Sequence, residues 1–164
     1  MKIGIFSDVH DNLGSLRKAF TWFAGESIDT FIFCGDFCSP IVALEMGAFS
    51  GTIHAVFGNG DGDRFTIAKL AGSKSPNLVL YGECAELRIA DRRIAVNHYP
   101  LLGRALACTG DYDAVFSGHT HIASKENIGA CLWFNPGEIM GWKGVPTVGV
   151  YSSEDNTAIL HPIE

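Results

Sequence analysis

Short apolar runs alternate with helix-like stretches along the 164-residue chain. The first run covers residues 2–7, and the apolar positions after it have the three- and four-residue spacing of one buried helix face ending at Gly25: Leu13, Leu16, Ala19, Phe20 and Phe23. Further strands are predicted at 30–34, 52–57, 78–81, 86–89, 94–97, 114–116, 130–134, 147–151 and 158–160, with a hairpin turn at 91–93. Helices are predicted at 40–49, 65–70 and 101–108. This alternation favours a mixed β/α sandwich or layered sheet.

Length and composition narrow the class of protein. Hydrophobic residues make up 47% of the chain and charged residues 18%, which is typical of a compact soluble protein. The length suits one domain, so we expect residues 1–164 to form a single domain with one active site. No apolar run at the N-terminus is long enough for a signal peptide or membrane span, so we expect a cytoplasmic protein without membrane association. Five cysteines without a C-x-x-C pair favour reduced thiols.

The net charge of −6 argues against broad binding of a nucleic-acid backbone. An anionic substrate would therefore need a local positive centre. Bound cations would supply one, because they would be the largest local charges in the site.

Polar residues of metal-binding types follow five of the predicted strands. They lie in Asp8-Val9-His10, Gly35-Asp36, Gly58-Asn59-Gly60-Asp61, His98 and Gly118-His119-Thr120-His121. In open α/β sheets, ligands bind outside the carboxyl ends of the strands, so we expect these loops to converge on one crevice. The glycines before Asp36, Asn59 and His119 suit sharp turns or a close approach of the backbone.

The seven candidate donors are carboxylate, imidazole and amide groups without a thiolate: Asp8, His10, Asp36, Asn59, His98, His119 and His121. Such donors suit Mn, Fe, Ni or Zn. Seven donors exceed the need of one four-coordinate zinc ion but fit two divalent ions that share a bridging carboxylate. Each segment alone has a simpler explanation, such as a helix cap for Asp8, a partly buried histidine for His10, or a turn for Gly-Asn-Gly-Asp. Four of the six histidines fall in this ordered set, which favours a paired metal site.

These segments, in this order, resemble the calcineurin-like metallophosphoesterase superfamily, whose pattern is D-x-H, G-D, G-N-[HC]-[DE], H and G-H-x-H. The match spans residues 8–121. The length and the Asn135-Pro136-Gly137 segment make the chain most similar to the compact bacterial and archaeal phosphodiesterase branch, which includes the eukaryotic retromer subunit. The resemblance implies a four-layer α/β/β/α sandwich of two mixed sheets flanked by helices. It also implies hydrolysis of a small phosphodiester or nucleotide-like substrate.

The resemblance further implies an assignment of the metal ligands. Metal one would be held by Asp8, His10, Asp36 and His121. Metal two would be held by Asp36, Asn59, His98 and His119, so that Asp36 bridges the dinuclear centre. A hydroxide shared by the two ions would attack phosphorus in line, while Asn59 and His98 contact the phosphate.

Gly60 is the main departure from the family pattern, because many members have a His there that is regarded as the general acid, and others have a Cys. Proton donation from Gly60 is excluded. General acid catalysis is typically worth about 10²–10⁴-fold, so we expect better turnover of activated phosphodiesters than of esters with poor leaving groups. For Asp61 two roles are open: a substitute acid, or a solvated loop carboxylate.

Three further positions could contact substrate or alter the charge of the site. Tyr99 follows His98 where many members have Gly, and it either lines the substrate pocket or packs. Arg64 is either a contact to the substrate phosphate or a solvent-facing residue at a helix start. Asp11, where Gly is common, adds negative charge beside the metals.

Two alternative functions stay open. The retromer subunit indicates that this fold can serve as an interaction scaffold, a route for which loss of metal ligands is expected, whereas all seven positions are filled here. A phosphomonoesterase would usually need the acid missing at Gly60 and larger specificity loops. The oligomeric state is open too, since Trp133 and Trp142 suit either a homo-oligomer interface or a core.

Overall fold

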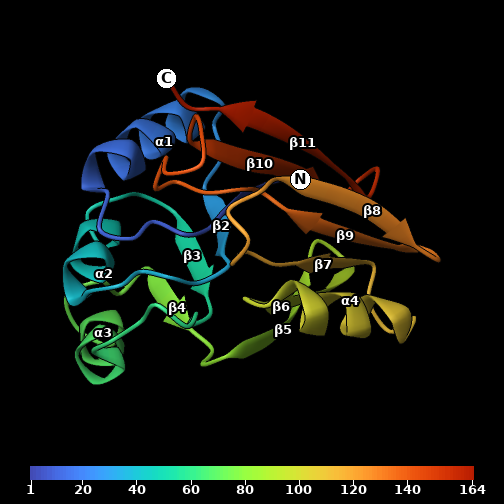
Figure 1. Cartoon of the computed structure of the whole chain (residues 1–164), viewed down its shortest axis with the longest axis horizontal. Helices are drawn as coiled ribbons and strands as arrows, with labels where there is room; N and C mark the ends of the chain where they lie inside the picture. The colour runs from blue at the N-terminus through green and yellow to red at the C-terminus, as the bar shows by residue number, and fades with distance from the viewer.

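Two β-sheets lie face to face in the computed structural model, which describes residues 1–164 (Figure 1). The six-stranded sheet contains β1 (Lys2–Phe6), β2 (Thr30–Phe33), β3 (Thr52–Ala55), β4 (Leu78–Leu80), β10 (Thr147–Ser152) and β11 (Thr157–Pro162), in the order β11-β10-β1-β2-β3-β4. The five-stranded sheet contains β5 (Cys84–Ile89), β6 (Arg92–Asn97), β7 (Ala114–Phe116), β8 (Ser124–Ile128) and β9 (Cys131–Asn135), in the order β5-β6-β7-β9-β8. Both sheets mix parallel and antiparallel pairs.

Four helices cover the outer faces of the sheets: α1 (Leu13–Gly25), α2 (Pro40–Met46), α3 (Arg64–Ala71) and α4 (Pro100–Cys108). In Figure 1, α1, α2 and α3 lie together on one side of the molecule and α4 lies apart, beside the second sheet. The first three helices pack on the six-stranded sheet, while α4 packs on the other sheet around Ala107 and Trp133. Ile5, Phe116 and Tyr151 belong to a separate apolar cluster between the sheets. This arrangement confirms the predicted four layers.

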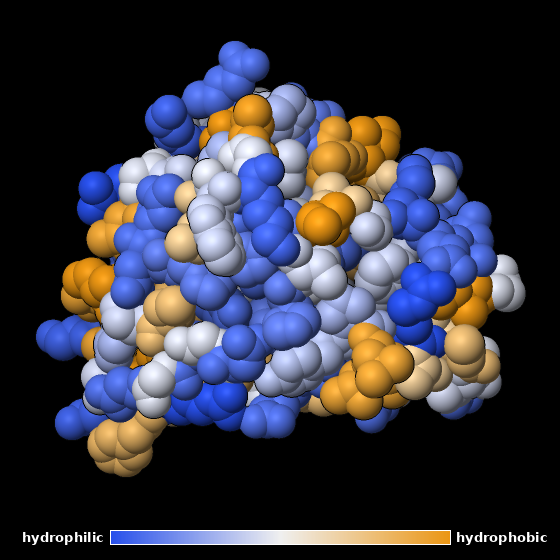
Figure 2. Space-filling model, in the orientation of Figure 1, coloured by the Kyte–Doolittle hydropathy of each residue, from blue (hydrophilic) through white to orange (hydrophobic).

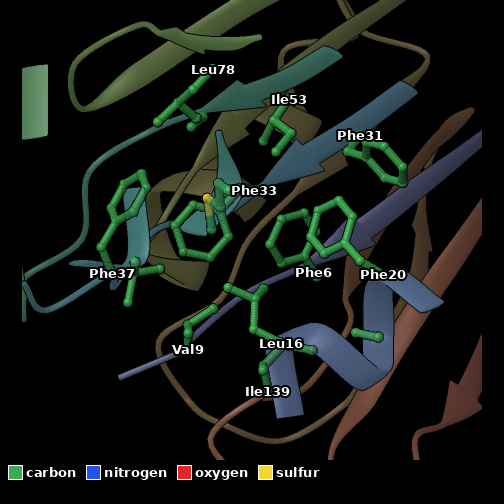
Figure 3. Packing of buried hydrophobic residues seen from close by; sticks show 14 of the residues in the cluster. Phe6, Val9, Leu16, Phe20, Phe31, Phe33, Phe37, Ile53, Leu78 and Ile139 are labelled. Atoms are coloured by element: carbon green, nitrogen blue, oxygen red, sulfur yellow. The ribbon is translucent and has the colours of Figure 1, made fainter. Parts of the chain in front are cut away.

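Phenylalanine rings fill the layer between α1 and the six-stranded sheet. Phe6 of β1 meets Phe20 of α1 edge to face, with ring centroids 5.4 Å apart (Figure 3). Gly4 allows this packing, because a Cβ at that position would collide with the rings of Phe23 and Phe31. Burial of these aromatic surfaces stabilises the attachment of α1 to the sheet that positions the first two ligand loops.

The predicted elements are all present, with differences at their ends and one omission. The predicted hairpin is present, but its turn is Ala90-Asp91 and not 91–93, with φ values of 49° and 62°, while Arg92 and Arg93 belong to β6. This pair of left-handed residues is typical of a two-residue hairpin turn. Strand β8 was not predicted, because it is an edge strand of mainly exposed polar residues.

The surface combines a polar centre with scattered apolar patches. Figure 2 shows one face that is largely hydrophilic at its middle and has apolar patches towards its edges. The interface role suggested for Trp133 is wrong because Trp133 is buried, whereas Trp142 is 72% exposed. No helix combines the length and hydropathy that a membrane span requires.

Candidate metal centre

The topology brings the five predicted ligand loops together. Strands β1, β2 and β3 are parallel neighbours, so the loops that follow them lie at one edge of the six-stranded sheet. Strands β6 and β7 are also parallel neighbours, and they place the loops at 98 and 118–121 at one edge of the second sheet. The donor atoms of four residues from these loops all lie within 4.8 Å of one another: Asp8, His10, Asp36 and His121. This group is the ligand set that the sequence resemblance implied for metal one.

His10 and His121 direct their Nε2 atoms at carboxylates. His10 Nε2 lies 3.2 Å from Asp36 Oδ2 and 3.8 Å from Asp8 Oδ1, and His121 Nε2 lies 3.4 Å from Asp8 Oδ1. His10 Nε2 is buried and makes no hydrogen bond of acceptable geometry. A buried nitrogen that meets carboxylate oxygens without a hydrogen bond fits a metal ligand.

A second group of donors meets at Asn59. His98 Nε2 lies 3.1 Å from Asn59 Oδ1 and 3.4 Å from Asp36 Oδ2, and His119 Nδ1 lies 2.7 Å from Asn59 Oδ1. The His98 Nδ1–H donates a hydrogen bond to the Cys34 carbonyl oxygen at 2.8 Å. In the neutral ring, Nε2 then carries no proton, and its lone pair is available to a metal ion. Lone pairs of Asp36, Asn59 and His98 then face one another, an arrangement that a cation would stabilise.

The ligand loops have an unusual backbone. Five of the predicted ligands have a positive φ, between 44° and 71°: Asp8, His10, Asp36, His119 and His121. Such left-handed residues are uncommon outside glycine and concentrate at functional sites. Of the three preceding glycines, only Gly35 has a positive φ, of 101°. Gly58 and Gly118 provide space instead, since a Cβ would collide with the Asp36 carboxylate in one case and with Ser7 Oγ and Asp8 in the other.

Backbone amides hold the two carboxylates. The His119 N–H donates to Asp8 Oδ2 at 3.0 Å, and the Gly60 N–H donates to Asp36 Oδ1 at 2.7 Å. Burial disfavours the charged form of Asp36, but the neighbouring imidazoles of His10 and His98 and the Gly60 N–H outweigh it and hold the pKa of Asp36 well below its usual value. The carboxylates of Asp36 and Asp8, which face His10 Nε2, raise the pKa of His10 to about 11. The cluster therefore attracts positive charge, which protons or metal ions can supply.

Asp61 is buried, so the alternative of a solvated loop carboxylate is wrong. Its Oδ1 accepts a hydrogen bond from the Cys38 N–H at 2.9 Å, and its Oδ2 accepts one from the Gly58 N–H at 2.7 Å. Burial raises the pKa of Asp61 above its usual value. Its carboxylate thus joins the loop after β2 to the loop after β3.

Tyr99 and Arg64 lie beside the cluster. The Tyr99 ring meets the rings of His119 and His98 at centroid distances of 5.1 and 5.3 Å. Arg64 donates to Glu83 Oε1 at 2.6 Å and to the Gly58 carbonyl oxygen at 2.7 Å. The Arg64 guanidinium is therefore already hydrogen-bonded within the protein.

The Asp11 carboxylate binds Ser39, which is not one of the predicted ligands. Its Oδ1 accepts hydrogen bonds from the Ser39 N–H at 3.1 Å and from the Ser39 hydroxyl at 2.7 Å, at the start of α2. Asp11 thus stabilises the connection between the first and second ligand loops.

Two residues that contact the predicted ligands were missed in the sequence. Glu138 Oε2 lies 2.5 Å from His121 Nδ1, and Cys38 Sγ lies 3.1 Å from His10 Nδ1. The signal for Glu138 was its place directly after Asn135-Pro136-Gly137, and that for Cys38 was its place two residues after Asp36. Neither spacing identifies which histidine is contacted. The two histidines outside the predicted set lie elsewhere, His54 against Tyr81 and His161 against Trp22.

Comparison with known proteins identifies the family and the fold. The calcineurin-like phosphoesterase superfamily domain matches residues 1–156. The phosphodiesterase MJ0936 of Methanocaldococcus jannaschii is 36% identical over 159 residues, which cover 94% of each chain. A solved structure of an archaeal phosphodiesterase is similar with a TM-score of 0.91 and 33% identity, covering 99% of each chain. Vps29 of Chaetomium thermophilum shares the fold, with a TM-score of 0.71, 14% identity, and coverage of 98% of this chain and 93% of Vps29.

Proposed function

The chain belongs to the calcineurin-like phosphoesterase superfamily, and from this premise we propose that it is a metal-dependent phosphodiesterase acting on small phosphodiesters. The observation that carries the proposal is the convergence of donor atoms from Asp8, His10, Asp36 and His121 within 4.8 Å of one another. The similarity to named phosphodiesterases over nearly the whole chain supports the same activity.

We further propose that the centre holds two divalent ions, drawn from Mn, Ni, Fe and Zn. Asp8, His10, Asp36 and His121 would hold one ion, and Asp36, Asn59, His98 and His119 the other. The contacts of Asp36 with both His10 and His98 support its role as the shared ligand. When bound, such ions supply a water of lowered pKa and positive charge at the phosphoryl oxygens.

Asn59 and His98 would position the phosphate. Because Asn59 Oδ1 faces the imidazoles of His98 and His119, the Asn59 amide N–H groups are left to donate to a phosphoryl oxygen. His98 is fully buried and fixed by Cys34, so its ring keeps one orientation during the reaction. Tyr99, beside His119, would line the substrate pocket.

We propose that Asp61 holds the loops after β2 and β3 together and does not donate a proton. Both of its oxygens accept backbone hydrogen bonds, so donation of a proton to the leaving group would require Asp61 to leave Cys38 or Gly58. Contact between Arg64 and a substrate phosphate stays a prediction, and it would require competition with Glu83.

A cytoplasmic location is part of the proposal. All five cysteines are free, and two of them are buried, which suits a reducing compartment.

The activity is tested with metal-stripped protein, to which Mn, Ni, Zn or Mg is added separately. We expect hydrolysis of bis-p-nitrophenyl phosphate to exceed that of p-nitrophenyl phosphate, to require metal, and to be lost in Asp36→Asn. A matched substitution at the exposed Asp155→Asn should retain activity. Two bound ions without turnover of either ester would instead favour a metal-stabilised interaction scaffold, and faster monoester hydrolysis a phosphomonoesterase.

A further inference from the structure

Glu138 is a buried carboxylate next to the proposed metal centre. It follows β9, and the next two residues bind the backbone after β1: the Ile139 N–H donates to the Ser7 carbonyl at 3.0 Å, and the Met140 N–H to the Asp8 carbonyl at 2.9 Å. The Glu138 side chain is only 2% exposed. Burial of a carboxylate is costly unless its oxygens find donors, so its partners indicate why it is there.

Both carboxylate oxygens of Glu138 have a partner. Oε2 lies 2.5 Å from His121 Nδ1, and Oε1 accepts a hydrogen bond from the Lys143 N–H. Because an ionised carboxylate only accepts hydrogen bonds, His121 Nδ1 carries the proton. In the neutral ring, His121 Nε2 is then a lone-pair donor, and it lies 3.4 Å from Asp8 Oδ1.

The three inward-facing imidazoles have different partners at Nδ1. The partner is a carbonyl oxygen for His98 and a thiol for His10, but a carboxylate for His121. A carboxylate accepts a hydrogen bond more strongly than a neutral group does, and it fixes the orientation of the ring as a ligand. Among these three imidazoles, His121 is thus the one whose Nδ1 is held by a carboxylate side chain.

We propose that Glu138 is a positioning residue that fixes the tautomer and ring orientation of His121 for metal binding. The inference rests on the proposed function, since it assigns a role to a residue outside the seven ligands. Glu138 also links His121 to the segment between β9 and β10 through the Lys143 N–H. Lys143 Nζ donates in turn to the Thr120 carbonyl oxygen at 2.8 Å. Two contacts, one through Glu138 and one through Lys143, therefore join this segment to the loop at 118–121.

The test compares Glu138→Gln and Glu138→Ala with Glu126→Gln, an exposed glutamate on β8 that pairs with Arg104. Calorimetric titration of the metal-stripped proteins with Mn measures the affinity at each site. We expect Glu138→Ala to lose about 10–100-fold in affinity for one ion, Glu138→Gln to lose less because an amide oxygen still accepts from Nδ1, and Glu126→Gln to bind as the unchanged protein does.

A second measurement reports the tautomer without metal. Long-range ¹H–¹⁵N NMR should find the His121 proton on Nδ1 in the unchanged protein and in Glu138→Gln, and partly on Nε2 in Glu138→Ala. Glu138→Gln also serves if Glu138→Ala does not fold. Wild-type Mn affinity in both Glu138 variants, with the His121 proton still on Nδ1 in Glu138→Ala, would overturn the proposal. If Glu138→Ala does not fold, wild-type Mn affinity in Glu138→Gln alone would overturn it. Absence of Mn binding by the unchanged protein would instead contradict the proposed function, so the two failures are distinguishable.

Discussion

At the scale of single residues, two glycines affect the site because they lack a side chain. Gly118 has no room for a side chain, because a Cβ would collide with Ser7 Oγ and Asp8 Oδ2. Gly60 leaves the position of the usual family acid without a side chain, and its N–H donates to Asp36. One glycine therefore permits the site to form, and the other limits the chemistry available to it.

Gly118→Ala should destabilise the fold and weaken metal binding. The added methyl group must displace Ser7 or Asp8, and overpacking of this kind typically costs about 1–3 kcal/mol. Urea unfolding and calorimetric Mn titration measure the two effects. Gly144→Ala is the control, because nothing lies within 4 Å of a Cβ there, and it should change stability by less than about 0.5 kcal/mol. Equal stability of the two variants would contradict the predicted collision.

Without a general acid at Gly60, the rate should depend strongly on the leaving group. A poorly acidic leaving group departs slowly when no proton is donated to it, a disadvantage of about 10²–10⁴-fold. We expect kcat/KM to fall steeply along a series of aryl phosphodiesters as the pKa of the released phenol rises. A flat series would indicate that another group donates the proton, with Asp61 as the candidate left open by the sequence.

The convergence of the seven predicted ligand residues could be predicted from the sequence because each follows an apolar strand, and the ends of neighbouring strands meet in space. Glu138 could not be assigned in this way, since its contact with His121 depends on how the segment after β9 passes the end of β1. The sequence singles out Asp61 but leaves its role open, because its hydrogen bonds to the Cys38 and Gly58 N–H groups form only in the folded loops.

At the scale of elements, the spacing of apolar residues predicts the buried helices and strands, but it does not predict an edge strand of polar residues. The 3- and 4-residue spacing of apolar residues predicted α1, which begins and ends at Leu13 and Gly25 as expected. Strand β8 carries mainly exposed residues and is recruited by pairing with β9, so it has no hydrophobic signal of its own. Tertiary pairing, and not local propensity, determines such an edge strand.

His54 on β3 should make the fold less stable in mild acid. Its Nδ1 lies 2.9 Å from the Tyr81 hydroxyl, and burial lowers its pKa below the usual value of 6.5. As pH falls below that value, the unfolded chain binds the proton first, so stability decreases until pH is below the folded-state pKa. His54→Gln should reduce the loss of unfolding free energy between about pH 7 and about pH 5, measured by urea titration. An unchanged pH dependence in His54→Gln would contradict this assignment.

At the scale of the whole molecule, the proposed metal centre lies where the two sheets meet. The six-stranded sheet supplies Asp8, Asp36 and Asn59, whereas the second sheet supplies His98 and the loop at 118–121. The geometry of the centre therefore depends on how the sheets pack through their shared cluster. A layered β/α arrangement could be predicted from the strand and helix pattern, but the four layers followed only from the family resemblance. We propose that this shared core makes residues 1–164 one domain.

Metal binding should stabilise the whole fold, because ions bound between the sheets bind the native state and not the unfolded chain. At a free metal concentration about 100 times Kd, the expected gain is about 2.7 kcal/mol for one site. Differential scanning calorimetry of stripped protein with increasing Mn should therefore record a rising Tm, and Asp36→Asn should lose most of that rise. A Tm independent of Mn would contradict a site shared by the sheets.

Five predicted ligand residues have a left-handed backbone, so selection for a more stable fold would act against keeping these residues. Each such residue costs about 1–2 kcal/mol relative to a right-handed conformation, a cost that glycine avoids. A library screened only for resistance to proteolysis would favour glycine at exposed ligands such as His119, and would gradually remove the catalytic site while retaining the fold. Selection for thermal tolerance in this protein should therefore include metal binding as a second criterion.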